Sequence, residues 1–178
     1  MKIRMILGCV IACMGATAHA NTEVYQAPDA FVAEMFGGAA PAAQALWLDQ
    51  DLRTTLKGVL GHKPGVRMRY WASGDRTVWI LEEVGKDLPI TAGIAIKAGA
   101  IDEVRVLVFR ESRGWEIKYP FFTKQFRAAQ LTARGLSQPI DGITGATLSV
   151  RAMKRMARAA LLLHQHTPNG NTALAAAK

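Results

Sequence analysis

Cysteine is nearly absent from the sequence, because its two cysteines, Cys9 and Cys13, both lie among the first twenty residues. If those residues are removed, the mature chain has no thiol, which excludes disulfides, thiol catalysis and cysteine-bound metal ions. The chain must then be stabilised by its core rather than by covalent cross-links, which suits its length of 178 residues. Any redox chemistry would need a cofactor.

Long hydrophobic runs are also missing. The run from Met5 to Met14 is almost wholly apolar, but it is shorter than the roughly 20 residues that cross a bilayer. With Lys2 and Arg4 before it and Ala18-His19-Ala20 after it, this run is typical of a signal peptide cleaved near Ala20. We therefore expect a mature chain without a transmembrane segment, in the periplasm or elsewhere outside the cytoplasm. The alternative is a lipoprotein, since the residues before Cys13 loosely resemble a lipidation sequence.

Blocks of consecutive like charges are absent as well. The net charge is +8, and loss of Lys2 and Arg4 leaves 20 basic against 14 acidic residues, a net charge of +6. One dense basic group has helical spacing, which is typical of a solvated helix face. It consists of Arg151, Lys154, Arg155 and Arg158. Because no recognition motif accompanies these charges, we expect no nucleic-acid binding.

The composition is that of a globular protein, since half of the residues are hydrophobic and a fifth are charged. The length favours a single domain. We expect a signal peptide over residues 1–20, a helical segment over 21–65 that packs on the domain, the domain itself over 66–166, and a loose tail over 167–178.

Local patterns predict two helices followed by a series of strands. A short helix over residues 28–36 ends at Gly37-Gly38, and an amphipathic helix runs from Leu46 to about Leu60. Segments with alternation or with many strand-favouring residues predict four strands, over residues 66–71, 77–84, 88–97 and 101–109. These strands are expected to form an antiparallel meander.

Further patterns complete the predicted fold. In the last strand Val104, Val106 and Val108 are expected to share one face. A loop over residues 111–119 leads to a short helix over 120–126, whose phenylalanines lie on or near one side. A long helix follows from about Leu148 to His164. Together these elements predict an α+β fold, an antiparallel sheet with helices packed against it.

The most informative segment is Asp141-Gly142-Ile143-Thr144-Gly145-Ala146-Thr147-Leu148-Ser149, where a loop enters the long helix. Unpaired N–H groups and the helix dipole attract phosphate to such a helix start. Gly145 and Ala146 would let a ligand approach the backbone, and Thr144, Thr147 and Ser149 offer hydroxyl groups. The residues alone leave two interpretations open, a phosphate site or a turn that merely caps the helix. The spacing excludes a nucleotide-binding P-loop, a Gly-x-Gly-x-x-Gly fingerprint and a Gly-x-Ser-x-Gly elbow.

This segment resembles the flavinylation motif of the FMN-binding domain family, which includes subunits of sodium-pumping NADH:quinone reductase and of the Rnf electron-transport complex. The family pattern is Asp, two variable residues, Ser or Thr, Gly, Ala, Thr or Ser, one variable residue, and Ser or Thr, and the sequence matches every position. By this resemblance Thr147 would carry FMN through a phosphoester, installed by a Mg-dependent flavin transferase that takes FMN from FAD. The rest of the implied cofactor site would comprise Asp141, Thr144, Gly145, Ala146, Leu148 and Ser149.

A second segment, Glu111-Ser112-Arg113-Gly114, stands where many relatives have Glu-Thr-Pro-Gly. Glu111 and Gly114 agree with that pattern, whereas Ser112 and Arg113 depart from it. The resemblance extends from about Ile90 to Leu163 and implies the α+β fold of FMN-binding domains. It adds Glu111, Gly114 and Trp115 to the candidate cofactor site.

Roles for individual residues follow from this resemblance. Trp115 is either an aromatic contact to the isoalloxazine ring or an ordinary half-buried aromatic. Glu111 either hydrogen-bonds the flavin or holds the backbone of its loop. Asp141 is expected to order the turn and the helix start through its carboxylate. His164 and His166 are expected to be solvated at the helix end rather than to bind a metal ion.

The favoured hypothesis is an exported flavoprotein, an extracytoplasmic electron carrier whose cofactor is covalent FMN. Its partners would be the flavin transferase and a membrane or periplasmic redox protein. No general acid, base or nucleophile accompanies the motif, so we expect no catalytic residues and no metal site. Two alternatives stay open: a small FMN-dependent reductase that acts directly on an acceptor such as a quinone or a ferric chelate, and a binding module without flavin.

Overall fold

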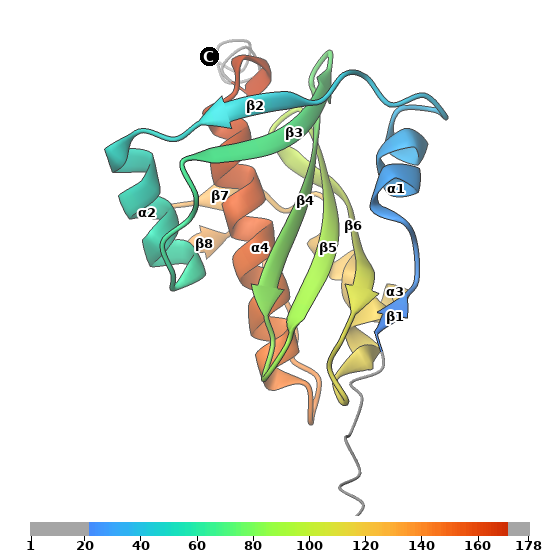
Figure 1. Cartoon of the computed structure of the whole chain (residues 1–178). Helices are drawn as coiled ribbons and strands as arrows, with labels where there is room; N and C mark the ends of the chain where they lie inside the picture. The colour runs from blue at the N-terminus through green and yellow to red at the C-terminus, as the bar shows by residue number, and fades with distance from the viewer. Residues whose placement is uncertain (1–21, 171–178) are drawn as a thin grey trace, which may run out of the picture.

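The protein, described by a computed structural model over residues 22–170, is built around a six-stranded antiparallel sheet (Figure 1). Its strands are β1 (Glu23–Val24), β2 (Gln44–Trp47), β3 (Arg67–Ser73), β4 (Arg76–Val84), β5 (Pro89–Lys97) and β6 (Ala100–Phe109). The strand order is β1-β6-β5-β4-β3-β2, so the predicted meander of β3 to β6 is confirmed. The predicted signal peptide lies outside the described residues.

Helices cover both faces of this sheet. They are α1 (Pro28–Met35), α2 (Gln50–Leu60), α3 (Pro120–Thr123) and α4 (Thr147–Gln165), with the 3-10 helices η1 (Trp115–Lys118) and η2 (Lys124–Phe126). α4 packs against β4, β5 and β6, with α2 beside it, while α1 lies over β4 and β5 on the opposite face (Figure 1). A short hairpin of β7 (Leu131–Thr132) and β8 (Gly135–Leu136) contacts α4. The predicted α+β class is confirmed.

The sheet is buried on both faces because successive residues of its central strands enter different apolar clusters. In β5, Ile94 and Ile96 belong to the large cluster under α4, whereas Ala95 packs with Phe31 of α1. A Cβ atom at Gly93 would lie 2.4 Å from the Phe31 ring, so the absence of a side chain there admits α1. Burial of one such aromatic side chain contributes about 1.5–3 kcal/mol.

The amphipathic helix begins later than predicted, because its expected first residues form a strand instead. Gln44–Trp47 is β2, which pairs with β3 at the edge of the sheet. α2 starts at Gln50, and Asp49 Oδ1 accepts a hydrogen bond from the N–H of Leu52 at 2.8 Å. The prediction of a helix from Leu46 was wrong because a short apolar segment fits an edge strand as well as a helix.

The prediction that three valines of β6 share one face of the sheet is also wrong. Thr91 pairs with Val108 but the next residue, Ala92, pairs with Val106, which leaves Leu107 as an extra residue in β6. Such a bulge turns the residues beyond it to the other side of the sheet. Val104 and Val106 therefore lie in the cluster under α4, whereas Val108 lies in the cluster under α1.

The segment after β6 is more ordered than a loop. Residues 115–118 form η1, so the predicted loop contains a helical turn. The predicted short helix is present as α3 and η2, where Phe122 and Phe126 are fully buried with ring centres 5.4 Å apart. Phe121 is exposed, because neighbouring helical residues point about 100° apart and cannot both face the core.

The start of the predicted tail is held in place. Thr167 is fully buried, and its hydroxyl donates to the carbonyl of His164 at 2.7 Å. Asn169 Nδ2 donates to the carbonyl of Gly74 in the β3–β4 turn at 2.7 Å. The prediction of a loose segment is therefore wrong for residues 167–170, while residues 171–178 lie outside the described range.

His164 is buried in the core and not solvated as predicted. Its Nδ1 lies 2.8 Å from Oγ1 of Thr77, which itself accepts a hydrogen bond from Trp79 Nε1 at 3.0 Å. Burial lowers the pKa of the His164 imidazole below its ordinary value, because the charged form would lose its hydration. His166, two residues further along at the end of α4, is exposed as expected.

This buried histidine should make stability depend on pH. Its folded-state pKa lies below the unfolded value of about 6.5, so the unfolded chain binds the proton first as the pH falls. We expect the free energy of unfolding to decrease below about pH 6.5, by at most about 1.4 kcal/mol per pH unit from this residue. Urea unfolding of the wild type and of His164→Gln over this range measures the effect. Equal slopes in the two proteins would contradict it.

Candidate functional site

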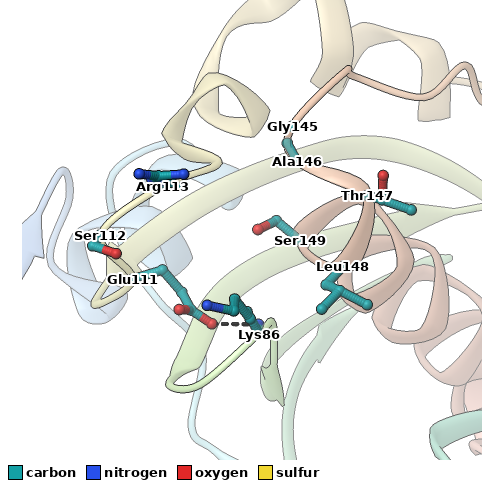
Figure 2. Close-up of a pocket in the computed structure, with 9 residues that line it drawn as sticks. All are labelled: Lys86, Glu111, Ser112, Arg113, Gly145, Ala146, Thr147, Leu148 and Ser149. Atoms are coloured by element: carbon teal, nitrogen blue, oxygen red, sulfur yellow. Dashed lines mark hydrogen bonds between the residues drawn. The ribbon is translucent and has the colours of Figure 1, made fainter.

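The start of α4 and the loop after β6 enclose a cavity of about 510 Å³ (Figure 2). Residues 145–149 line it from α4, residues 111–113 from the loop after β6, and Lys86 from the β4–β5 turn. The two sequence segments singled out by the family resemblance thus face each other across one cavity, although they are separated by more than one helix and a hairpin in the chain. Lys86 carried no signal in the sequence.

The start of α4 provides hydrogen-bond donors at this cavity. The first backbone bond of the helix runs from the N–H of Val150 to the carbonyl of Ala146 at 2.9 Å. The N–H groups of residues 147–149 precede that bond, and no side chain caps the helix, whose N-cap residue is Ala146. Within the described chain these three groups are therefore left for a ligand, and the helix dipole adds positive potential there. The capping interpretation of the hydroxyl-rich turn is not supported.

The hydroxyl residues of this turn differ in their access to the cavity. Thr147 is exposed and lines it, whereas Ser149 lines it but is only 4% exposed. Thr144 is exposed and does not line the cavity. Gly145 is exposed with φ +84°, and a Cβ atom there would meet no atom within 4 Å, so a ligand can approach the backbone at Gly145, whereas the next residue, Ala146, is buried.

Gly114 lies where the two motif segments approach each other closely. Its φ of +87° lies in the left-handed region that favours glycine, and a Cβ atom at this position would lie 2.6 Å from Ser149 Oγ. The close approach of Gly114 to the first turn of α4 therefore requires a residue without a side chain. Trp115, which follows it, is 42% exposed and packs edge-on against Tyr119 rather than lining the cavity.

Glu111 fixes the opposite wall of the cavity. Its Oε1 accepts hydrogen bonds from the backbone N–H groups of Lys86 at 2.5 Å, Asp87 at 2.8 Å and Leu88 at 3.0 Å (Figure 2 draws the first). Of the two roles considered for Glu111, the structure shows the backbone one, but the backbone it holds is the β4–β5 turn and not its own loop. This contact brings Lys86 to the cavity.

Replacement of Glu111 by glutamine tests this contact. The amide oxygen can still accept from the turn, but it lacks the charge that strengthens hydrogen bonds to N–H groups. We expect Glu111→Gln to lower the free energy of unfolding by about 1–2 kcal/mol in urea denaturation. Glu116→Gln removes a nearby charge that makes no such contacts and should change stability by less than about 0.5 kcal/mol. Equal effects of the two variants would contradict the role assigned to Glu111.

Asp141 does not order the helix start in the way expected. It is exposed, and its backbone N–H donates to Gln125 Oε1 at 2.7 Å, which ties the turn to η2. Since no side chain caps α4, the expectation that its carboxylate does so is wrong. Asp141 also does not line the cavity.

The charge around the cavity suits an anion. Lys86 and Arg113 line it, and the one carboxylate among its lining residues, that of Glu111, is engaged by three N–H groups. Among residues 22–170 no cluster of three or more His, Cys, Asp or Glu side chains is arranged to hold a metal ion. Within the same range no helix is long and apolar enough to cross a membrane.

These features define a class of protein, an α+β domain with a cavity suited to an anion between a helix start and the loop after the last sheet strand. Residues 85–162 match the model of the FMN-binding domain family, and the protein contains an FMN-binding domain. The matched range holds β5, β6, both motif segments and most of α4. The expected resemblance to this family is therefore confirmed over these residues, and the domain supports FMN as the cofactor. No curated protein matches the sequence.

Proposed function

We propose that this protein is an exported electron carrier that holds FMN covalently, through a phosphoester to the hydroxyl oxygen of Thr147. One observation carries the proposal: Thr147 is an exposed hydroxyl residue at the first position of α4, and it lines a cavity together with Leu148 and Ser149, where the helix start leaves backbone N–H groups without a partner. Phosphate is the group that such a helix start binds best.

The residues around Thr147 fit a flavin phosphate. The N–H groups of residues 147–149 would hold phosphate oxygens, and Lys86 and Arg113 would add positive charge on the other side of the cavity. Ser149 is a poorer attachment point, because it is nearly buried against Gly114. Thr144 is poorer as well, because it lies off the cavity. Exposure and position together favour Thr147.

Attachment would balance as a phosphoryl transfer from FAD. The Thr147 hydroxyl oxygen forms a bond to the FMN phosphorus, the bond between that phosphorus and the AMP oxygen breaks, and AMP leaves while the hydroxyl proton passes to solvent. A Mg-dependent flavin transferase is the proposed catalyst. When bound, FMN supplies the capacity to accept and release electrons, and the protein supplies its position and electrostatic surroundings.

Export and attachment support each other. The first twenty residues have the pattern of a signal peptide, and the chain after them has no cysteine. Outside the cytoplasm a dissociated FMN would not be replaced, whereas a tethered one remains with its protein. A carrier rather than an enzyme is favoured because the cavity-lining residues include neither histidine nor tyrosine, and their one carboxylate is occupied by the β4–β5 turn.

Co-expression with a flavin transferase, followed by intact mass, tests this function. We expect the mature protein to gain one FMN, less water, only when the transferase is present. An unmodified mass, under conditions where the transferase labels another substrate, would contradict the proposal. Turnover with a chemical electron donor separates carrier from reductase, since a carrier should reduce quinones or ferric chelates no faster than free FMN does.

A further inference from the structure

A second cavity, of about 430 Å³, lies between α2, α4 and the β7–β8 hairpin, which are neighbours in Figure 1. Five cationic side chains line it: Arg134 of the hairpin turn and Arg151, Lys154, Arg155 and Arg158 of α4. We call it the basic cavity. Four of these residues form the group that the sequence assigned to a solvated helix face.

The positive charge of the basic cavity is largely unbalanced. Arg155 Nη1 lies 3.6 Å from Oε1 of the buried Glu83, which also contacts His62. The remaining four cations form no ion pair with any acidic side chain of the described chain, and that part contains all 14 acidic residues of the sequence. Like charges three and four residues apart on a helix destabilise it by about 0.2–0.5 kcal/mol per pair.

Two of the guanidinium groups lie close to glycines of neighbouring elements. A Cβ atom at Gly135, where φ is +122°, would lie 3.6 Å from Arg158 Nε, and one at Gly61 would lie 3.7 Å from Arg155 Cζ. The hairpin thus lies beside Arg158, and the end of α2 lies beside Arg155. Arg158 Nε is buried and has no hydrogen-bond partner among the described residues. Such a donor is costly unless something accepts from it.

The rest of the cavity wall is apolar. Val59, Leu136, Pro139 and Ile140 line it beside the cationic residues. A ligand that fits both the cationic and the apolar wall has a small group with more than one negative charge, attached to an organic portion. Phosphate meets the first requirement best, because guanidinium groups bind it through paired hydrogen bonds and lysine adds a point charge.

We propose that the basic cavity is a second ligand site, which binds the phosphate group of a phosphate ester. The ester is either a soluble phosphorylated molecule or the headgroup of an anionic phospholipid. Its position on later turns of α4 separates it from the cavity at Thr147. The site does not depend on the presence of FMN.

The two sources are separated by two probes. Inorganic pyrophosphate, titrated into the purified protein by calorimetry, tests the soluble source. Sedimentation with phosphatidylglycerol vesicles, against phosphatidylcholine vesicles, tests the lipid source. The test variant is Arg151→Gln/Arg158→Gln. The matched control, Arg67→Gln/Arg69→Gln, removes the same charge from β3.

Saturable binding of either probe that weakens at least about tenfold in the test variant, and not in the control, supports the site. Binding that persists in the test variant overturns it, since the phosphate would then occupy another surface such as the start of α4. Equal losses in both double variants, or no binding at all, also overturn it. If circular dichroism shows that the test variant does not fold, Arg134→Gln in the exposed hairpin turn serves instead, with a severalfold loss expected.

Discussion

Replacing Thr147 by alanine is expected to abolish covalent flavin. The exposed hydroxyl of Thr147 would be the only oxygen joined to the FMN phosphorus, so its removal leaves nothing to form the ester. Thr147→Ser keeps a hydroxyl at the same backbone position and should retain labelling. Flavin fluorescence of the denatured protein in a gel, together with intact mass, measures the label. The exposed position of Thr147 means that stability should change by less than about 0.5 kcal/mol.

Ser149→Ala is the matched control for this loss. It removes the other hydroxyl that lines the cavity, but one that lies nearly buried against Gly114. We expect this variant to keep covalent flavin. The assignment of Thr147 as the attachment point would be contradicted if Thr147→Ala were still labelled. It would also be contradicted if folded Ser149→Ala lost the covalent flavin.

A valine at Gly114 is expected to destabilise the fold by about 3 kcal/mol or more. The backbone there has φ +87°, which a β-branched residue adopts only with strain, and the added Cβ would lie 2.6 Å from Ser149 Oγ. The clash would push the loop after β6 away from α4 and open the cavity. Urea denaturation measures the loss, and a change below about 1 kcal/mol would contradict this reading of Gly114.

The two causes at Gly114 can be separated by a pair of milder changes. Gly114→Ala retains both the backbone strain and the contact with Ser149. Combining it with Ser149→Ala removes the nearest atom of that contact but leaves the strain. We therefore expect the double variant to recover part of the stability lost in Gly114→Ala, and no recovery would show that backbone strain alone is responsible.

The parts of the fold that repeat a local pattern could be predicted from the sequence. The strands β3 to β6 are rich in residues that favour strands and are separated by turns, and α4 carries apolar residues at the spacing of one buried helix face. These are Val150, Met153, Met156, Ala157, Ala160 and Leu161, all of which are buried. β2 was missed because it is a four-residue edge strand that exists only through its pairing with β3. The bulge at Leu107 was missed for a similar reason, since a one-residue register shift has no signature in alternation alone.

Burial of polar residues was the main thing that the sequence could not predict. His164 follows the apolar residues of α4 and was expected to be solvated at the end of the helix. That end of α4 packs against β4, however, and places His164 next to Thr77. The basic group of α4 was expected to be a solvated face, and Arg151 is indeed exposed, but α2 and the β7–β8 hairpin lie beside the group and leave Lys154, Arg155 and Arg158 partly buried. In both places the partner lies in a distant segment.

The sequence predicted which residues form the candidate site better than it predicted how they come together. Six of the ten expected residues line the cavity, and Gly114 adjoins it through Ser149. Asp141, Thr144 and Trp115 lie outside the lining. Lys86 enters only because Glu111 binds the β4–β5 turn, a contact between a side chain and three N–H groups that sequence spacing does not encode. The attachment of FMN to Thr147 stays a prediction.

One measurement tests that attachment most directly. Trypsin should release the peptide Gly135–Arg151, which contains Thr144, Thr147 and Ser149 and has no internal lysine or arginine. From protein co-expressed with a flavin transferase, we expect this peptide to carry the mass of FMN and its fragments to assign the phosphate to Thr147. An unmodified peptide, or fragments that assign FMN to Thr144 or Ser149, would contradict covalent attachment at Thr147.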